Sequence, residues 1–527
     1  MKTSFKKTVL LLATIVFIVC LLLPTLTACN NMGPGATDRL VIYNWEDYID
    51  VNMTKEFAAY YKQVTGRSLD ITYTTFDTNE TMMTKVLKND ANVDLICPSE
   101  YAIQKLMLAG CLENQRDIYE EIKPQLETYG ITLDGMSSLK DLYPENSEDE
   151  IDYGNIEPSI IEAVKSIFTG LDDGNGNIYN MVDYMVPYFY GTLGILYNTK
   201  IVSIEELEEF GWGVLWNVQN NRKLENKILM KDSVRDSYAA AVFYMYENTL
   251  NHRGVHELPD GVSPSYNKPF AELSVQELIN CTDDAMLAAA ERVLTEQRDH
   301  ISGYEVDFGK DDMVNEIVYA DLAWSGDAMY AIEEGDYYED TDTYQLDYYV
   351  PPTASNIWYD GWVIPKTVNN KLAAMMFIEY MCNPMSGIRN SMEVGYSSAV
   401  AKEKLQSDSD VCEFIVDSYT FDEDGNPYEV DKETGEIIYY DYNDYFDDER
   451  RYPVINDTLG VMRDFGAKND TVVQMWQRAK SGAGIETSLW WILLVIVLGI
   501  GLAVGAYFGL QALKLRPRKV KKETDPE

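Results

Sequence analysis

Between residues 39 and 110 the chain alternates short apolar segments, typical of β-strands, with amphipathic segments, typical of α-helices. The expected strands are residues 40–45, 69–76 and 93–99, and the expected helices are residues 52–66 and 79–89. Strands that alternate with helices form parallel sheets with right-handed crossovers. The region therefore predicts an α/β fold, and at 527 residues the chain is long enough for two or more such units.

The predicted strands end in polar and aromatic residues, where strand ends usually carry glycine, asparagine or another turn residue. Ligands of open α/β sheets gather at the carboxyl ends of the strands. The first and third strands run into Trp45, Glu46, Asp47, Ser99 and Tyr101. Later segments of similar character supply Asp236, Trp324, Asp327, Trp358, Asp360 and Tyr396. These eleven residues are the candidate binding site.

The candidates combine aromatic rings with carboxylates, which suits a ligand with cationic ends and an apolar middle. Carboxylates form charge-assisted hydrogen bonds with ammonium groups, and aromatic faces attract cations. Paired carboxylates between aromatic platforms could also cleave a sugar. His252, His256 and His300 lack the spacing of a metal site, and no serine or cysteine has the setting of a nucleophile. We therefore expect no catalytic residue, no metal and no cofactor.

An apolar segment lies near each end of the chain. Residues 1–28 predict a lipoprotein signal peptide, with Cys29 as the lipidated first residue of the mature protein; an uncleaved N-terminal anchor is the alternative. Residues 489–513 carry no charge and predict a transmembrane helix, and the basic residues 514–527 predict a cytoplasmic tail. The rest of the protein is then expected on the extracytoplasmic face of the cell membrane.

The net charge of the chain is −43. A surface this acidic repels nucleic acid and attracts cations, so no nucleic-acid partner is expected. Acidic residues are densest in residues 404–451, and this segment predicts a solvated β-hairpin insertion.

Eight ordered segments resemble the spermidine/putrescine-binding proteins of ABC transporters. They are LVIYNWEDYI, TYTTFDTNETMMTKV, DLICPSEYAIQKLMLAGCLE, VPYFYGTLGILYN, DSVRDSY, LAWSGDAMYA, WYDGWVIP and EVGYSSAV. The resemblance implies a two-lobed type II periplasmic-binding-protein fold with two hinge crossings. Lobe 1 would comprise residues 39–191 and 357–403, and lobe 2 would comprise residues 192–356 and 452–480.

The same resemblance implies a role for each candidate. Five residues would form an aromatic box around a polyamine chain: Trp45, Tyr101, Trp324, Trp358 and Tyr396. Glu46 and Asp47, with Ser99, would hold one amine, and Asp236, Asp327 and Asp360 would hold the others. The sequence departs from the family at Ser233, where some spermidine binders have an acid, and at Tyr190, where a tryptophan is frequent.

The implied function is that of a monomeric, non-enzymatic component of an importer, which delivers spermidine or putrescine to ABC permease subunits. Two alternatives stay open from the residues alone. The protein could sense an extracellular ligand, or it could act on carbohydrate at the cell surface. Neither spermidine nor putrescine is favoured by the sequence.

Overall fold

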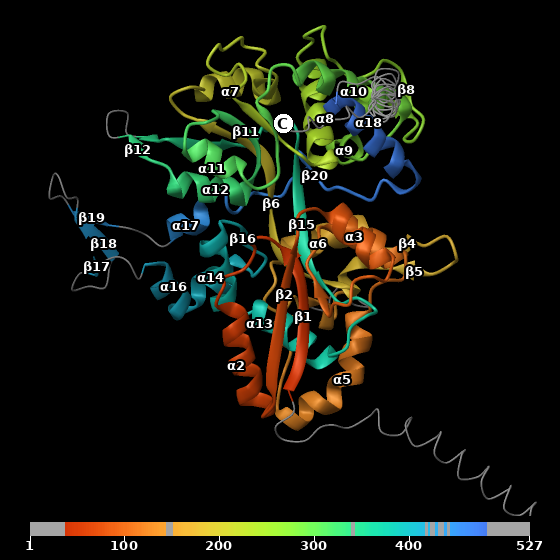
Figure 1. The fold of residues 1–527 in the computed structure, drawn as a ribbon, viewed down its shortest axis with the longest axis vertical. Coiled ribbons are helices and arrows are strands. Elements are labelled where there is room, and N and C mark those ends of the chain that lie inside the picture. Colours follow the sequence, from red (N-terminus) through yellow and green to blue (C-terminus); the bar gives the residue numbers. More distant parts are fainter. Residues whose placement is uncertain are drawn as a thin grey trace, which may run out of the picture.

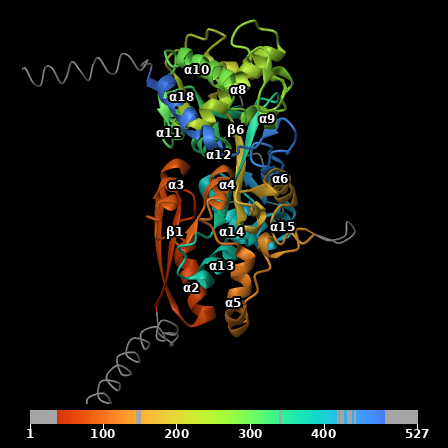
Figure 2. The same ribbon diagram turned by 90° about the vertical axis from the view of Figure 1, so that its right-hand side faces the viewer.

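The computed structural model describes residues 37–143, 151–338, 343–416, 420–421, 427–430, 437–439 and 443–481. These residues form two lobes that lie one above the other in Figures 1 and 2. The lobes share one path of hydrogen-bonded strands in the order β10-β7-β11-β6-β15-β3-β1-β2. The two-lobed α/β expectation is confirmed; the predicted residue limits of the lobes stay predictions.

The prediction of a transmembrane helix is corrected. No helix among the residues that the structure describes is long and apolar enough to cross a membrane. Residues 489–513 themselves lie outside those residues, as do the signal peptide, Cys29 and residues 514–527. The expectation of a single membrane crossing with a cytoplasmic tail is withdrawn with the helix.

Lobe 1, at the bottom of Figure 1, is built on the parallel strands β1 (Thr37–Trp45), β2 (Ser68–Phe76) and β3 (Leu95–Ile96). The connecting helices are α2 (Met53–Thr65) and α3 (Asn79–Leu87), and α4 (Glu100–Leu108) follows β3. Helix α2 buries Phe57 and Tyr61, one turn apart, and ends at Gly66, whose φ of 72° favours glycine. The predicted alternation of strands and helices is confirmed in this region.

Two long strands join the lobes. All fourteen residues of β6 (Met185–Asn198) are buried, as are all nine of β15 (Ser355–Val363). Strand β6 pairs with β15 from Met185 to Thr192, and then with β11 (Ala320–Trp324) of lobe 2 from Leu193 onward. A Cβ atom at Gly191 would lie 2.7 Å from the Trp358 ring, so a glycine is required at this position beside the ring.

Lobe 2 contains β7 (Ile228–Lys231), which pairs in parallel with β10 (Gly303–Glu305) and β11. Its main helices are α8 (Val234–Leu250), α10 (Asp284–Gln297), α11 (Gly309–Val314), α12 (Ser325–Glu334) and α18 (Asn469–Ser481). Strand β20 (Leu459–Gly460) is extended and pairs with β15. The Gln276 and Asn280 side chains hydrogen-bond to the backbone around Val461, which holds this segment away from helical geometry.

Further helices complete both lobes: α5 (Gln115–Tyr129), α6 (Pro158–Phe168), α7 (Ile204–Phe210), α9 (Val275–Ile279), α13 (Lys371–Met381), α14 (Pro384–Val394), α15 (Lys402–Ser407), α16 (Ser409–Ile415) and α17 (Asn443–Asp447). Within the predicted acidic insertion, β17 (Thr420–Phe421), β18 (Pro427–Val430) and β19 (Ile437–Tyr439) form an antiparallel sheet, which stands apart from both lobes in Figure 1.

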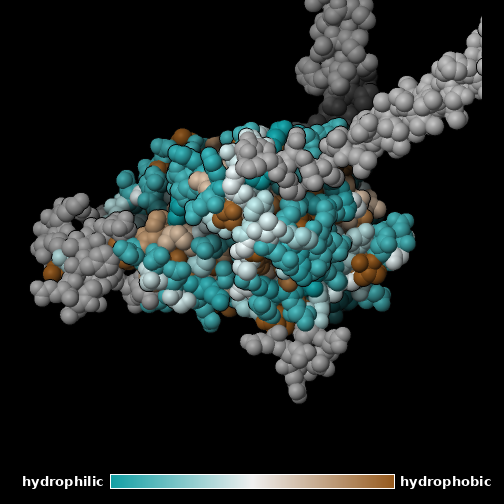
Figure 3. All heavy atoms as spheres, turned by 90° about the horizontal axis from the view of Figure 1, so that it is seen from below, coloured by the Kyte–Doolittle hydropathy of each residue, from teal (hydrophilic) through white to brown (hydrophobic). Residues whose placement is uncertain are grey.

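The outer surface matches the acidic composition. Figure 3 views the molecule from the lobe 1 end, and hydrophilic residues cover most of this face with only scattered hydrophobic ones. The apolar core is instead concentrated on the shared strands and their covering helices.

Candidate functional site: the cleft between the lobes

A cleft with about 930 Å³ of empty space, part of it open to solvent, lies between the lobes. The structure brings all eleven candidate residues to it: Trp45, Glu46, Asp47, Ser99, Tyr101, Asp236, Trp324, Asp327, Trp358, Asp360 and Tyr396. Some of them follow the carboxyl ends of strands, such as Trp45 at the end of β1 and Trp324 at the end of β11. Trp358 and Asp360 instead lie within β15, one of the two strands that join the lobes. Whether these residues bind a ligand stays a prediction.

The lobe 1 wall is centred on Asp360. This residue lies in β15, and the Tyr48 hydroxyl donates to its Oδ2 at 2.8 Å. Its Oδ1 is buried and has no hydrogen-bond partner among the described residues. Burial raises the pKa of Asp360 to about 7, an effect that the Ser99 and Tyr48 side chains oppose and that the charge of Asp236 reinforces. No lysine or arginine in the described part of the chain forms an ion pair with the Asp360 carboxylate.

Tyr48 is a site residue that sequence reasoning missed. It follows the exposed Glu46 and Asp47, and Asp47 adopts a φ of 47°, so the chain turns sharply and brings Tyr48 back into the protein. An aromatic residue after a turn normally indicates core packing. Its place beside the predicted Trp45-Glu46-Asp47 run was the only available signal.

Aromatic rings surround Asp360. The rings of Trp358 and Tyr396 meet edge to face with their centroids 5.5 Å apart, and Tyr48 meets Tyr396 at 5.1 Å. Trp45 packs on Phe76 at 4.6 Å. These contacts fix the orientation of the rings before any ligand arrives, which limits the entropy cost of binding.

Glu100, the first residue of α4, also lines the cleft and was not predicted. Its Oε2 accepts a hydrogen bond from the Tyr359 backbone N–H at 3.0 Å. Complete burial raises the pKa of Glu100 to about 8. Glu100 is therefore mostly protonated at neutral pH and adds little negative charge to the cleft.

The lobe 2 wall carries two predicted carboxylates in different settings. Asp236, near the start of α8, has Oδ1 3.3 Å from the Trp324 indole Nε1, and burial raises its pKa. Asp327, on α12, accepts from the Tyr396 hydroxyl at 2.8 Å and from the Lys231 ammonium at 3.2 Å. Lys231 is a third site residue that the sequence analysis missed.

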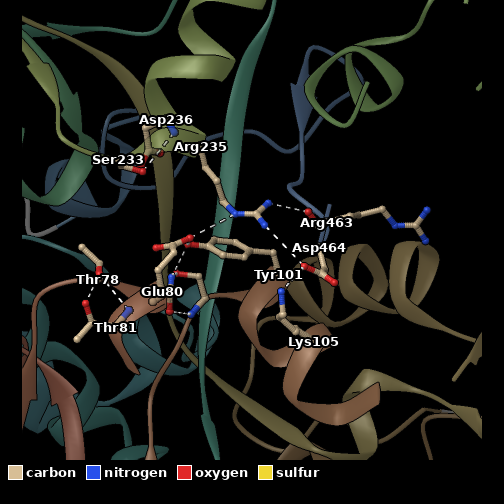
Figure 4. A network of polar contacts seen from close by, with 12 residues as sticks. Thr78, Glu80, Thr81, Tyr101, Lys105, Ser233, Arg235, Asp236, Arg463 and Asp464 are labelled. Carbon is tan, nitrogen blue, oxygen red and sulfur yellow. Dashed lines mark hydrogen bonds and ion pairs between the residues drawn. The ribbon is translucent and has the colours of Figure 1, made fainter. Parts of the chain in front are cut away.

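A polar network joins the lobes at one side of the cleft (Figure 4). The Arg235 guanidinium of α8 lies 3.7 Å from the centroid of the Tyr101 ring and 3.8 Å from a Glu80 oxygen, both in lobe 1. The neighbouring Asp464 forms an ion pair with Lys105 of α4 at 3.5 Å. One face of Tyr101 is therefore covered by a protein cation, although the resemblance assigns this ring to the ligand.

Comparisons with known proteins agree with this architecture. A family model described as hypothetical lipoprotein (MG045 family) matches residues 1–413. The spermidine/putrescine-binding periplasmic protein of Salmonella typhimurium is 22% identical over 372 residues, which are 70% of this chain and 80% of that protein. The putrescine-binding periplasmic protein of Pseudomonas aeruginosa is 21% identical over 67% of this chain and 76% of that protein. These relatives confirm the resemblance to polyamine-binding proteins.

Solved structures show the same fold. A putative spermidine/putrescine ABC transporter protein from Listeria monocytogenes superposes with a TM-score of 0.53 at 22% identity, covering 85% of this chain and 100% of that one. The Tp0655 lipoprotein of Treponema pallidum gives a TM-score of 0.51 at 17% identity over 84% and 99% of the two chains.

Proposed function

The chain belongs to the hypothetical lipoprotein (MG045) family, and from this premise we propose that it is the extracytoplasmic polyamine-binding component of an ABC importer. The observation that carries the proposal is the cleft between the lobes, where aromatic rings surround the buried Asp360 carboxylate. This carboxylate has one oxygen without a hydrogen-bond partner and no cation within 4 Å among the described residues. An ammonium group supplies both the missing donor and the missing charge.

In this proposal the polyamine lies between the aromatic rings and bridges the two walls. Each charge-assisted hydrogen bond stabilises the complex by about 1.5–3 kcal/mol. Two of them, together with contacts between methylenes and ring faces, give micromolar or tighter binding after the cost of association. Because Asp360 and Asp236 lie on opposite lobes, a ligand that touches both favours the closed form.

The relatives named above support a binding protein and not an enzyme. The ligand would be released unchanged to permease subunits in the membrane, and the protein would act as a monomer. A lipid on Cys29 would hold it at the extracytoplasmic face. The membership of a lipoprotein family supports this anchor.

The test is isothermal titration of the full-length protein, in detergent, with putrescine and spermidine. We expect 1:1 binding with a dissociation constant in the micromolar range or below, and unchanged polyamine at the end of the titration. Absence of binding to both amines would contradict the proposal. Turnover of a carbohydrate would favour the surface enzyme.

A further inference from the structure

The cleft contains an ammonium group of its own. Lys231 is the last residue of β7 and is 1% exposed, yet it lines the cleft. Its Nζ lies 2.5 Å from Glu305 Oε1 and 3.2 Å from Asp327 Oδ2, and it donates to the Val306 carbonyl at 3.1 Å. Of the three N–H donors of an ammonium, two make the hydrogen bonds to Asp327 and Val306, and Glu305 is in ion-pair contact with the same group.

The surroundings keep Lys231 charged. Burial alone would lower its pKa, but the carboxylates of Glu305, Asp327 and Asp321 overcome this effect and raise the pKa above its usual range. The same ammonium lies 4.2 Å from the centroid of the Trp324 ring, within cation–π distance. A protein cation therefore occupies both an aromatic face and a carboxylate of the predicted polyamine site.

Both carboxylate oxygens of Asp327 already accept a hydrogen bond from the protein. One of its oxygens accepts from the Tyr396 hydroxyl and the other from Lys231. A ligand amine bound to Asp327 would lie next to the Lys231 charge, and like charges repel strongly in a site of low dielectric constant. By contrast, neither Asp360 nor Asp236 has a lysine or arginine within 4 Å in the described part of the chain.

This inference rests on the proposed function. We propose that the Lys231 ammonium occupies the position beside Asp327 and Trp324 where a ligand amine would otherwise bind, so that the site accepts a diamine in preference to a triamine. The two positive charges of a diamine match the two buried carboxylates without a cation, Asp360 and Asp236. At the Asp327 and Trp324 position, the third charge of spermidine meets a carboxylate that already pairs with Lys231. Lys231 is then a specificity-determining residue of this chain.

The first test compares putrescine with spermidine by isothermal titration of the full-length protein and of Lys231→Met. We expect the unmodified protein to bind putrescine at least tenfold more tightly than spermidine. Lys231→Met frees Asp327 and the Trp324 face. We expect this variant to reduce the ratio of the spermidine and putrescine dissociation constants at least tenfold, mainly because spermidine binds more tightly.

A matched control is Lys310→Met. Lys310 of α11 also lines the cleft, but its ammonium lies over the Tyr330 ring, 5.3 Å from the centroid, and not at Asp327. Lys310 is partly exposed, so solvent screens its charge. Removing it is expected to change both affinities little and to keep their ratio within threefold. An equal change of the ratio in both variants would mean that total charge sets the preference, and would overturn the role of Lys231.

The substitution of Lys231 leaves Glu305 buried without its cation, so folding is checked by thermal unfolding. If Lys231→Met does not fold, Lys231→Met/Glu305→Gln removes both charges together, and the same narrowing of the ratio is expected. A preference of the unmodified protein for spermidine, or an unchanged ratio in the Lys231 variant, overturns this inference and leaves the proposed function intact. Binding of neither amine overturns the proposed function itself.

Discussion

The carboxylates on the two walls of the cleft differ in what surrounds them. On the lobe 1 wall, Asp360 has a tyrosine hydroxyl on one oxygen, and the other has no hydrogen-bond partner within the described residues. On the lobe 2 wall, Asp327 has a tyrosine hydroxyl on one oxygen and an ammonium on the other. Both residues are buried, so their neighbours decide which carboxylate is available to a cation.

On the lobe 1 side, the absence of a neighbouring cation makes ionisation of the buried carboxyl group unfavourable. Burial of an acid without a cation raises its pKa, here to about 7 for Asp360, which means that the ionised form is disfavoured in the empty cleft. A ligand that brings a positive charge relieves this penalty. On the lobe 2 side Lys231 has already relieved it, so a ligand gains less there.

The largest effect is expected for Asp360→Asn. The amide keeps the size of the side chain but removes the charge, so one charge-assisted hydrogen bond of about 1.5–3 kcal/mol is lost and putrescine binding weakens roughly 10- to 100-fold. Isothermal titration measures the change. Asp70→Asn, an exposed acid on β2, is the control and is expected to bind normally. Normal binding by Asp360→Asn would show that the site is assigned wrongly.

The second expectation concerns pH. Only ionised Asp360 pairs with an ammonium, and its pKa in the empty cleft is about 7. The affinity for putrescine should therefore be greatest above pH 8 and fall about tenfold for each unit below pH 7, because a proton then competes with the ligand. Titrations between pH 5.5 and 8.5 check this slope. The slope should flatten in Asp360→Asn, and an equally steep slope in that variant would assign the proton to another group.

The eleven residues predicted from the sequence all line the cleft, and their role in binding stays a prediction. Parallel strands of an α/β fold present their carboxyl ends at one edge, and for this reason Trp45 at the end of β1 and Ser99 after β3 line the same space. The order of strands and helices in lobe 1 followed from apolar periodicity, because buried strands and helices repeat their apolar residues at different spacings.

The electrostatic state of the cleft could not be predicted. A lysine after the apolar segment ILM ordinarily indicates a strand that reaches solvent, whereas Lys231 is buried because Glu305 and Asp327, 74 and 96 positions further on, fold around it. Tyr48 likewise depends on Asp360, 312 positions away. Partners at such separations leave no periodic pattern in the sequence.

A third, smaller effect is expected from the contact between the lobes. Arg235→Met keeps the aliphatic part of the side chain but removes the guanidinium that lies between the Tyr101 and Phe465 rings. We expect a larger radius of gyration of the unliganded protein by small-angle X-ray scattering, and about fivefold weaker putrescine binding, because closure is less favourable. Arg298→Met is the control, since the ion pair of Arg298 with Asp299 stays within lobe 2. Equal radii in all three proteins would contradict a role of Arg235 in closure.

The smallest effect is expected at the rim of the cleft. Asp47 is exposed and adopts a left-handed conformation that Asn tolerates, so Asp47→Asn changes only its charge. Exposed charge pairs contribute about 0.2–1 kcal/mol and are screened by salt, so putrescine binding should weaken less than fivefold at low salt and be unchanged at moderate salt. A salt-independent loss as large as that of Asp360→Asn would place an amine at the end of β1. The contrast between the two buried walls would then no longer account for affinity, since the dominant carboxylate would be an exposed one.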